Sequence, residues 1–272
     1  MVRYVRADEL HNAFNFDYLR TPWLAPQLFQ VIDETLRDHA EVGAPATWVL
    51  SNHDTARHLS RYARPQQADR SVHYLADLTG APDLELGLRR SRAATMLMLA
   101  LPGGAYIYQG EELGLPEVED LPEDALQDPT WERTGHTDRG RDGCRVPIPW
   151  SGTSAPFGFS ADDHTQPWLP QPDSFATRTV ERLEGDPTSI LEMYRSALGI
   201  RRAHPALRGG GIVRWLDVPD GALGFERDPG FVCLVNISAD RVELPADAEV
   251  LLASGPLDGT SVPPDTTVWL RR

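Results

Sequence analysis

The 272 residues, of which 41% are hydrophobic and 24% charged, can form one large domain or a large domain with a small second one. The 40 acidic residues outnumber the 26 basic ones, and the resulting net charge of −14 argues against nucleic acid or an anionic membrane surface as a partner. Two cysteines, no apolar signal segment in the N-terminal MVRYVRADEL and no stretch of transmembrane length lead us to expect a reduced, cytoplasmic location.

The first part of the chain alternates between strand and helix patterns. Alternating or continuous apolar runs predict three strands, the third of the fully buried type, at residues 13–19, 46–51 and 105–110. Helical spacing predicts the two intervening helices, the second of them buried in its apolar half, at residues 25–40 and 84–101. Strands and helices that alternate at this spacing form parallel βαβ units.

The pattern changes after the third predicted strand. Residues 116–187 are rich in proline and read as a structured, functional loop region rather than a passive connection. A helix is then predicted up to His204, with Asp186 as its cap and Pro187 in its first turn. The remaining residues form short alternating runs separated by turn residues, which predicts a small antiparallel β-domain.

Polar residues follow the second predicted strand directly, as Asn52, His53 and Asp54. Ligands of parallel barrels and open sheets bind at the carboxyl ends of strands, so these residues are candidates for function. One alternative is an ordinary turn capped by the Asn and Asp side chains. A metal site that includes His58 is disfavoured, because adjacent strand side chains diverge and nothing nearby completes a ligand set. The third alternative is hydrogen bonding to sugar hydroxyl groups.

The long loop presents two arginines four residues apart, Arg141 and Arg145, among prolines and before a tryptophan. Guanidinium groups on a rigid loop suit either pairing with carboxylates or bidentate contact with neighbouring hydroxyl groups. An ordinary surface ion pair is the simpler alternative.

Three segments in this order resemble the α-amylase family of glycoside hydrolases, and within it the α-glucosidase and oligo-1,6-glucosidase group. They are WVLSNHD (48–54), GGAYIYQGEELGL (103–115) and RDGCRVPIPW (141–150). DELHNAFNFDYL (8–19) and the stretch 126–150 resemble bacterial cytoplasmic α-glucosidases. The resemblance implies a (β/α)8 barrel, retaining hydrolysis of α-glucosidic bonds and an α-glucoside oligosaccharide as ligand. It implies neither a metal nor a cofactor.

The resemblance also implies roles for individual residues. Asp54 matches the family's third carboxylate, an aspartate that steadies the distorted sugar in the transition state. His53 matches the histidine that hydrogen-bonds sugar hydroxyls in the first subsite. Arg141 matches the loop arginine that reaches the terminal, non-reducing glucose, and Arg145 matches a second arginine that lines the entrance to the pocket.

The chain also departs from the family pattern. The family's nucleophilic aspartate and its acid/base glutamate lie on strands four and five, ahead of the segment that resembles residues 8–19. Eight βα units need about 250 residues, whereas residues 1–115 hold only three predicted strands. Glu111 and Glu112 belong to an element that is mainly architectural in the family, and we do not assign them as the missing pair.

We therefore expect an α/β chain that corresponds to about strands six to eight of a (β/α)8 TIM barrel, followed by a small antiparallel β-domain. The expected division is a partial barrel at 1–205, which includes the loop region 116–187, and a sandwich-like β-domain at 206–272. Three hypotheses follow. The chain is the C-terminal part of an α-glucosidase and inactive alone, or it complements a separate chain that carries strands one to five, or it is an autonomous sugar-binding or structural protein.

Overall fold

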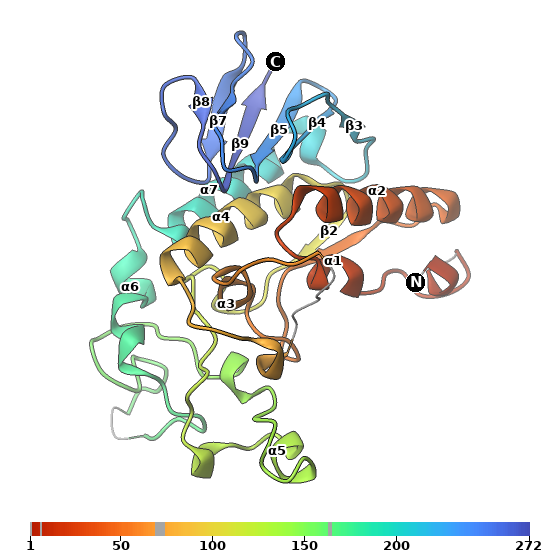
Figure 1. Cartoon of the computed structure of the whole chain (residues 1–272). Helices are drawn as coiled ribbons and strands as arrows, with labels where there is room; N and C mark the ends of the chain where they lie inside the picture. Colours follow the sequence, from red (N-terminus) through yellow and green to blue (C-terminus); the bar gives the residue numbers. More distant parts are fainter. Residues whose placement is uncertain (1, 6, 69–73, 163–164) are drawn as a thin grey trace.

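A computed structural model describes residues 2–5, 7–68, 74–162 and 165–272. Figure 1 shows a sheet at one end of the molecule, long helices beneath it, and an extended loop region at the opposite end. The loop region belongs to the proline-rich part of the sequence, and its helices among the described residues have five residues or fewer.

The helices differ greatly in length, and three of them, α2, α4 and α7, have 14 or more residues. The α-helices are α1 (Phe16–Arg20), α2 (Ala25–Val42), α3 (His58–Tyr62), α4 (Leu84–Ala100), α5 (Pro129–Arg133), α6 (Val180–Leu183) and α7 (Ile190–Ala203). The short 3-10 helices are η1 (Val2–Tyr4), η2 (Leu75–Asp77), η3 (Glu123–Ala125), η4 (Asp142–Cys144), η5 (Asp173–Thr177) and η6 (Pro205–Leu207).

The predicted start of the helix that ends near His204 is wrong by one turn. Its cap is Ser189, whose hydroxyl accepts the N–H of Glu192 at 3.2 Å. Asp186 instead accepts the N–H of Thr188 at 2.8 Å and forms a turn before the helix. Asp and Ser both accept backbone N–H groups at helix starts, so the sequence alone does not rank two such candidates three residues apart.

The first predicted strand, at residues 13–19, is also wrong, because α1 occupies its second half. The Asn15 side chain accepts the N–H of Tyr18 at 3.0 Å and donates to the Thr35 hydroxyl at 3.0 Å, which fixes it as the cap of a helix. The alternation of apolar and polar residues at 13–19 is too short to distinguish a strand from the start of a capped helix. Asp17 lies in the first turn of α1.

The other two predicted strands form a parallel pair, β1 (Thr47–Val49) and β2 (Gly104–Tyr106). β1 is buried, but the expectation that the third strand is fully buried is wrong, because Tyr106 is 40% exposed. Within the described residues β2 has β1 as its strand neighbour, so its other edge pairs with no strand. Gly103 precedes β2 with a φ of 108°, and the space of a Cβ there is taken by the Ala46 carbonyl.

The antiparallel pairing predicted for the C-terminal part is confirmed. Five strands form one sheet in the order β3-β4-β5-β9-β7. They are β3 (Arg214–Trp215), β4 (Ala222–Arg227), β5 (Phe231–Asn236), β7 (Glu249–Ala253) and β9 (Thr266–Arg271). A separate antiparallel pair joins β6 (Val242–Glu243) to β8 (Ser261–Val262).

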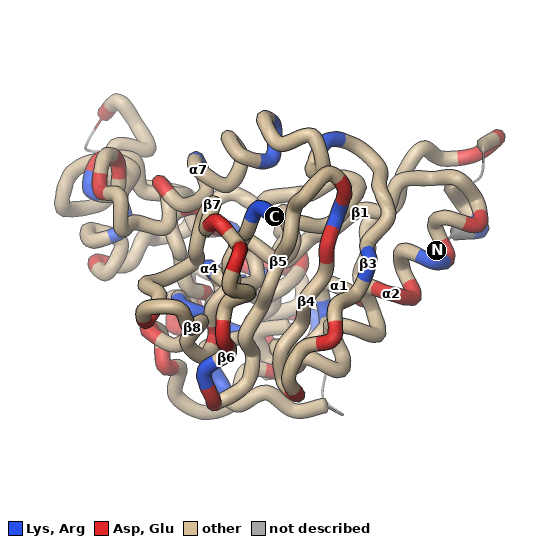
Figure 2. The backbone as a smooth tube through the Cα atoms, turned by 90° about the horizontal axis from the view of Figure 1, so that it is seen from above, with Lys and Arg blue, Asp and Glu red and all other residues tan. Residues whose placement is uncertain are grey.

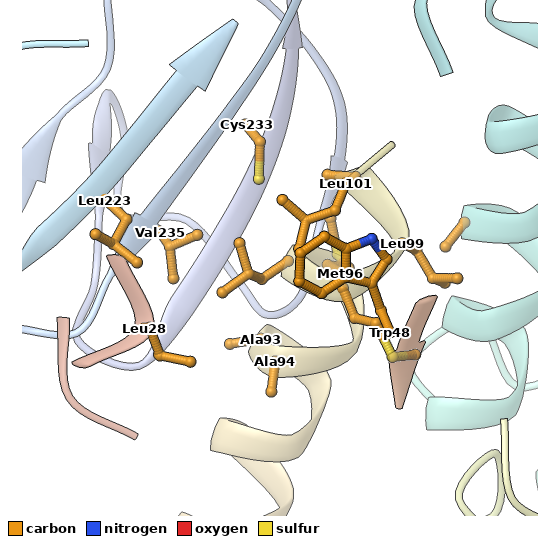
Figure 3. Close-up of a cluster of buried hydrophobic side chains, with 14 of the residues drawn as sticks. Leu28, Trp48, Ala93, Ala94, Met96, Leu99, Leu101, Leu223, Cys233 and Val235 are labelled. Carbon is orange, nitrogen blue, oxygen red and sulfur yellow. The ribbon is translucent and has the colours of Figure 1, made fainter. Parts of the chain in front are cut away.

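Helix α4 lies between the parallel pair and the five-stranded sheet. Its apolar half is buried on all sides, as the sequence predicted, and it forms one core with both sheets. Figure 3 shows side chains of this core, among them Met96 of α4 beside Trp48 of β1, with Leu223 and Val235 of the antiparallel sheet on the other side. Two hydrogen bonds tie β9 to the helix backbone, from Thr267 to the Ala93 carbonyl at 2.8 Å and from the Trp269 indole to the Met96 carbonyl at 3.1 Å.

Acidic and basic positions are interspersed over the face of the sheet seen in Figure 2. In the antiparallel sheet Arg271 of β9 pairs with Glu249 of β7, and Arg214 of β3 pairs with both Glu226 and Asp228. Among the helices of the described residues, none is both long and apolar enough to cross a membrane.

Replacement of Trp269 by alanine should destabilise the fold strongly. The side chain is fully buried between β9 and α4, so its removal leaves a cavity and deletes the hydrogen bond from the indole to the Met96 carbonyl, at an expected cost of about 3–5 kcal/mol. Urea denaturation measures this cost. Val250→Ala on the neighbouring strand β7, where the side chain is 41% exposed, is the control and should cost about 1 kcal/mol or less. Equal losses in both variants would contradict the assignment of α4 and β9 to one core.

Candidate functional site

A tight turn follows β1 and displays two of the predicted site residues. The Asn52 side-chain oxygen accepts the N–H of Asp54 at 2.8 Å and the Thr55 hydroxyl at 3.1 Å. The capped turn considered as an alternative is thus present, but it does not exclude a site. The side chains of His53 and Asp54 are 69% and 45% exposed, so the turn presents both to solvent.

The loop that carries Arg141 and Arg145, here called the arginine loop, contacts this turn. Arg141 Nη1 donates to Asp54 Oδ1 at 2.7 Å, and Arg145 Nη2 donates to the same oxygen at 3.2 Å. Arg145 Nε also donates to the His53 carbonyl at 2.8 Å, and His53 Nε2 lies 3.5 Å from Asp54 Oδ2. The structure therefore brings together all four residues that the sequence singled out, from segments about 90 positions apart.

A fifth residue in this cluster, Asp128, was not singled out from the sequence. Its carboxylate is fully buried and accepts hydrogen bonds from Arg141 Nε at 2.5 Å and from Arg141 Nη2 at 3.2 Å. Burial by itself would raise the pKa of the Asp128 carboxyl, but the hydrogen bonds from Arg141 and Thr130 outweigh it and hold that pKa well below its usual range. The sequence signal was the pair Asp128-Pro129, which predicts a helix cap but not a partner for arginine.

Arg57, also missed, joins the loops beneath the cluster. It is almost fully buried and donates to the Gln109 carbonyl at 2.8 Å and to the Cys144 carbonyl at 2.9 Å. Its own backbone N–H donates to the Glu117 carboxylate at 2.8 Å. Burial raises the pKa of Glu117 to about 7, against the opposing effect of Arg57. One guanidinium thus connects the turn after β1, the end of β2 and the arginine loop.

The histidines near Asp54 do not converge on a common point. The His58 ring is 3% exposed, and its Nδ1 shares a hydrogen bond with the Ser51 hydroxyl at 2.9 Å, whereas the His53 ring faces solvent. In the described part of the chain, no group of three or more His, Cys, Asp or Glu residues is placed to hold a metal ion.

Glu111 and Glu112 have contacts that favour the architectural interpretation. Glu111 is buried, the Tyr194 hydroxyl donates to its Oε2 at 3.2 Å, and burial raises its pKa to about 8. A carboxyl group with that pKa is mostly protonated at neutral pH, which suits a hydrogen-bonding role in the core and not nucleophilic attack. Glu112 Oε2 accepts the N–H of Gly110 at 2.8 Å and closes the turn after β2.

Substitution of Glu111 by glutamine should weaken the pH dependence of stability. The folded-state pKa of about 8 lies above the ordinary value of 4.5, so the folded protein holds a proton that the unfolded chain releases. The stability contributed by this proton is complete below pH 4.5 and is lost as the pH rises to about 8. Glu117, with its pKa near 7, retains part of the slope.

Thermal unfolding between pH 4.5 and 8.5 measures the effect, with Glu112→Gln as the control for loss of a neighbouring carboxyl. We expect a smaller fall of Tm with rising pH in Glu111→Gln than in the control. Equal slopes in the unsubstituted chain and in Glu111→Gln would show that Glu111 ionises at the same pH in both states.

The sequence of this chain matches a known protein family. Residues 4–210 match the alpha amylase catalytic domain. A probable alpha-glucosidase of Rhizobium meliloti (strain 1021) is 37% identical over 246 residues, which cover 88% of this chain and 40% of that protein. Maltase A1 of Drosophila melanogaster is 30% identical over 205 residues, which cover 74% of this chain and 30% of that protein.

Solved structures give the same answer for the fold. An alpha-glucosyl transfer enzyme, XgtA, superimposes with a TM-score of 0.78 at 27% identity and covers 100% of this chain, which spans 48% of that one. The isomaltulose synthase SmuA from Protaminobacter rubrum, at 23% identity and a TM-score of 0.74, shares the fold over 97% of this chain and 51% of its own. The chain thus spans between 30% and 51% of the length of these relatives, and it belongs to the alpha-amylase family of glycoside hydrolases.

Proposed function

We propose that residues 1–272 supply about strands six to eight of a (β/α)8 barrel and the C-terminal β-domain of a cytoplasmic α-glucosidase. In this proposal residues 1–205 are the partial barrel and residues 206–272 the β-domain. The match to a probable alpha-glucosidase over 88% of this chain supports it. The cytoplasmic location is supported by Cys144 and Cys233, which are both free and buried.

The observation that carries the proposal is the exposed Asp54 carboxylate, which lies at the end of a parallel strand beside His53 and two arginines. A sugar that loses its leaving group develops positive charge on the ring, and its hydroxyl groups bind an anionic acceptor more strongly as that charge grows. Asp54 is such an acceptor, since solvent reaches its carboxylate. His53 and the two arginines bring donors to the hydroxyl groups of the same glucose unit.

The reaction itself needs two further carboxyl groups. Retaining hydrolysis uses a nucleophile and an acid/base whose carboxyl groups stand about 5–5.5 Å apart on either side of the bond. Asp128, Glu111 and Glu117 are all buried, so they are poorly placed to flank a sugar beside Asp54. We propose that the nucleophile and acid/base come from strands four and five, and that residues 1–272 alone do not hydrolyse α-glucosides.

One edge of β2 has no strand partner among the described residues, which favours a second candidate, complementation by a separate chain that carries strands one to five. Phe14 and Tyr106 stack edge to face at 4.8 Å, and both are partly exposed, as is Ile107. An open strand edge with exposed aromatic residues attracts another polypeptide segment. An autonomous sugar-binding protein would gain nothing from such a surface.

Hydrolysis of p-nitrophenyl α-glucoside tests both candidates. We expect no turnover by residues 1–272 alone, and turnover after co-expression with the N-terminal part of the Rhizobium meliloti relative, up to the region that matches this chain. Asp54→Asn should reduce that turnover by about 100-fold or more, because it removes the charge that stabilises the transition state.

Asp38→Asn on the exposed side of α2 is the matched control and should leave turnover unchanged. Absence of turnover in the co-expressed pair leaves the first candidate standing and removes the second. Turnover by residues 1–272 alone that vanishes in Asp54→Asn would contradict the proposal and would direct attention to Glu111 and Glu112.

A further inference from the structure

Two carboxylates share the same arginines but differ in exposure. Asp54 is 45% exposed and receives one hydrogen bond each from Arg141 and Arg145. Asp128 is fully buried and receives three hydrogen bonds from Arg141, from its backbone N–H at 3.1 Å, Nε at 2.5 Å and Nη2 at 3.2 Å. Its Oδ2 also lies 3.6 Å from Arg145 Nη1.

The two contacts are therefore not equivalent in strength. An ion pair that water reaches adds little net stability and exchanges its partners easily, because water and salt replace each half of it. A buried carboxylate that loses its cation is left desolvated and unpaired, which is strongly unfavourable. Contact with Asp128 is also the main reason why the pKa of Arg141 lies above its usual range, and Asp54 contributes less.

The backbone holds the Asp128 carboxylate in position. Its own N–H donates to the Asp142 carboxylate at 2.8 Å, and its Oδ1 accepts the N–H of Thr130 at 3.0 Å, which caps α5. Gly140 adopts a φ of 71°, and a Cβ at that position would lie 2.7 Å from the Asp128 Cβ. The loop thus passes over Asp128 with no space for a larger residue.

We propose that Asp128 is the positioning residue of this site, which keeps Arg141 and Arg145 in place while Asp54 exchanges its arginine contacts for hydroxyl groups of an α-glucoside. Without the Asp128 contact, the Arg141 side chain would move together with Asp54 and would continue to neutralise its charge when a ligand approaches. The identity of the sugar rests on the proposed function. The role of Asp128 in holding the two arginine side chains in place does not, so it can be tested without hydrolysis.

Arginine modification by 2,3-butanedione, followed by mass spectrometry of peptides, measures how firmly each guanidinium is held in residues 1–272. Asp128→Asn retains an acceptor for the α5 cap but removes the charge. We expect the modification rate of Arg141 to rise about tenfold, as loss of a charge-assisted hydrogen bond implies, and that of Arg145, whose Nη1 lies 3.6 Å from Asp128 Oδ2, to rise less. Asp54→Asn should raise them by less than about threefold, because that contact is exposed.

Two controls separate positioning from loosening of the loop. Asp124→Asn removes an exposed charge from the same region and should change no rate. Arg139 lies in the same loop and donates to the Leu121 carbonyl, so its modification rate reports general opening of the loop. A parallel rise at Arg139, an equal effect of Asp54→Asn, or unchanged rates in Asp128→Asn would each overturn the proposal.

A measurement on the unsubstituted chain covers the case in which Asp128→Asn does not fold. The distance beyond which salt screens the interaction between exposed charges is about 10 Å at 0.1 M and about 3 Å at 1 M. Buried contacts are screened much less. If Asp128 holds the arginines, their rates stay constant between these concentrations, and a rise would overturn the proposal. Turnover by residues 1–272 alone that vanishes in Asp54→Asn, with firmly held arginines, would count against the proposed function alone.

Discussion

The packing of α4 against two different sheets is the constraint on which the rest of the molecule depends. Its apolar half contacts the parallel pair on one side and the antiparallel sheet on the other, and it hydrogen-bonds β9 through Thr267 and Trp269. β1 and β2 are only three residues long, and their pairing lies against this helix in the same core. Both strands end at the same edge, and the loops that follow them carry Asp54 and the Arg57 contacts.

Charge in the candidate site is arranged in two layers. The outer layer, Asp54 and His53, faces solvent and is free to meet a ligand. The inner layer, which includes Asp128, Arg57 and Glu117, is buried and bonded to backbone groups of several loops. Burial makes inner contacts hard to break and exposure makes outer contacts easy to exchange, so the inner ions support the loops and the outer ions form the proposed binding surface.

Some elements could be predicted from the sequence because their signals are local. The buried helix at 84–100 and the alternating strands of the C-terminal part follow from apolar periodicity alone. The strand predicted at 13–19 was wrong because the Asn15 cap depends on a distant Thr35 hydroxyl as well as on nearby residues. The exposure of Tyr106 was missed because burial is a property of neighbouring strands, and the sequence of a strand does not say which neighbours cover it.

The sequence by itself determined the chemistry that is available: an Asn-His-Asp turn after a strand, two arginines on a rigid loop, and the order of segments that marks the family. Only the tertiary structure decided which charges meet. Arg141 lies 87 positions from Asp54 and 13 from Asp128, and no periodicity connects such distances. Contacts between loops depend on how the sheets hold those loops, and this depends on the packing of α4, which is a property of the whole fold.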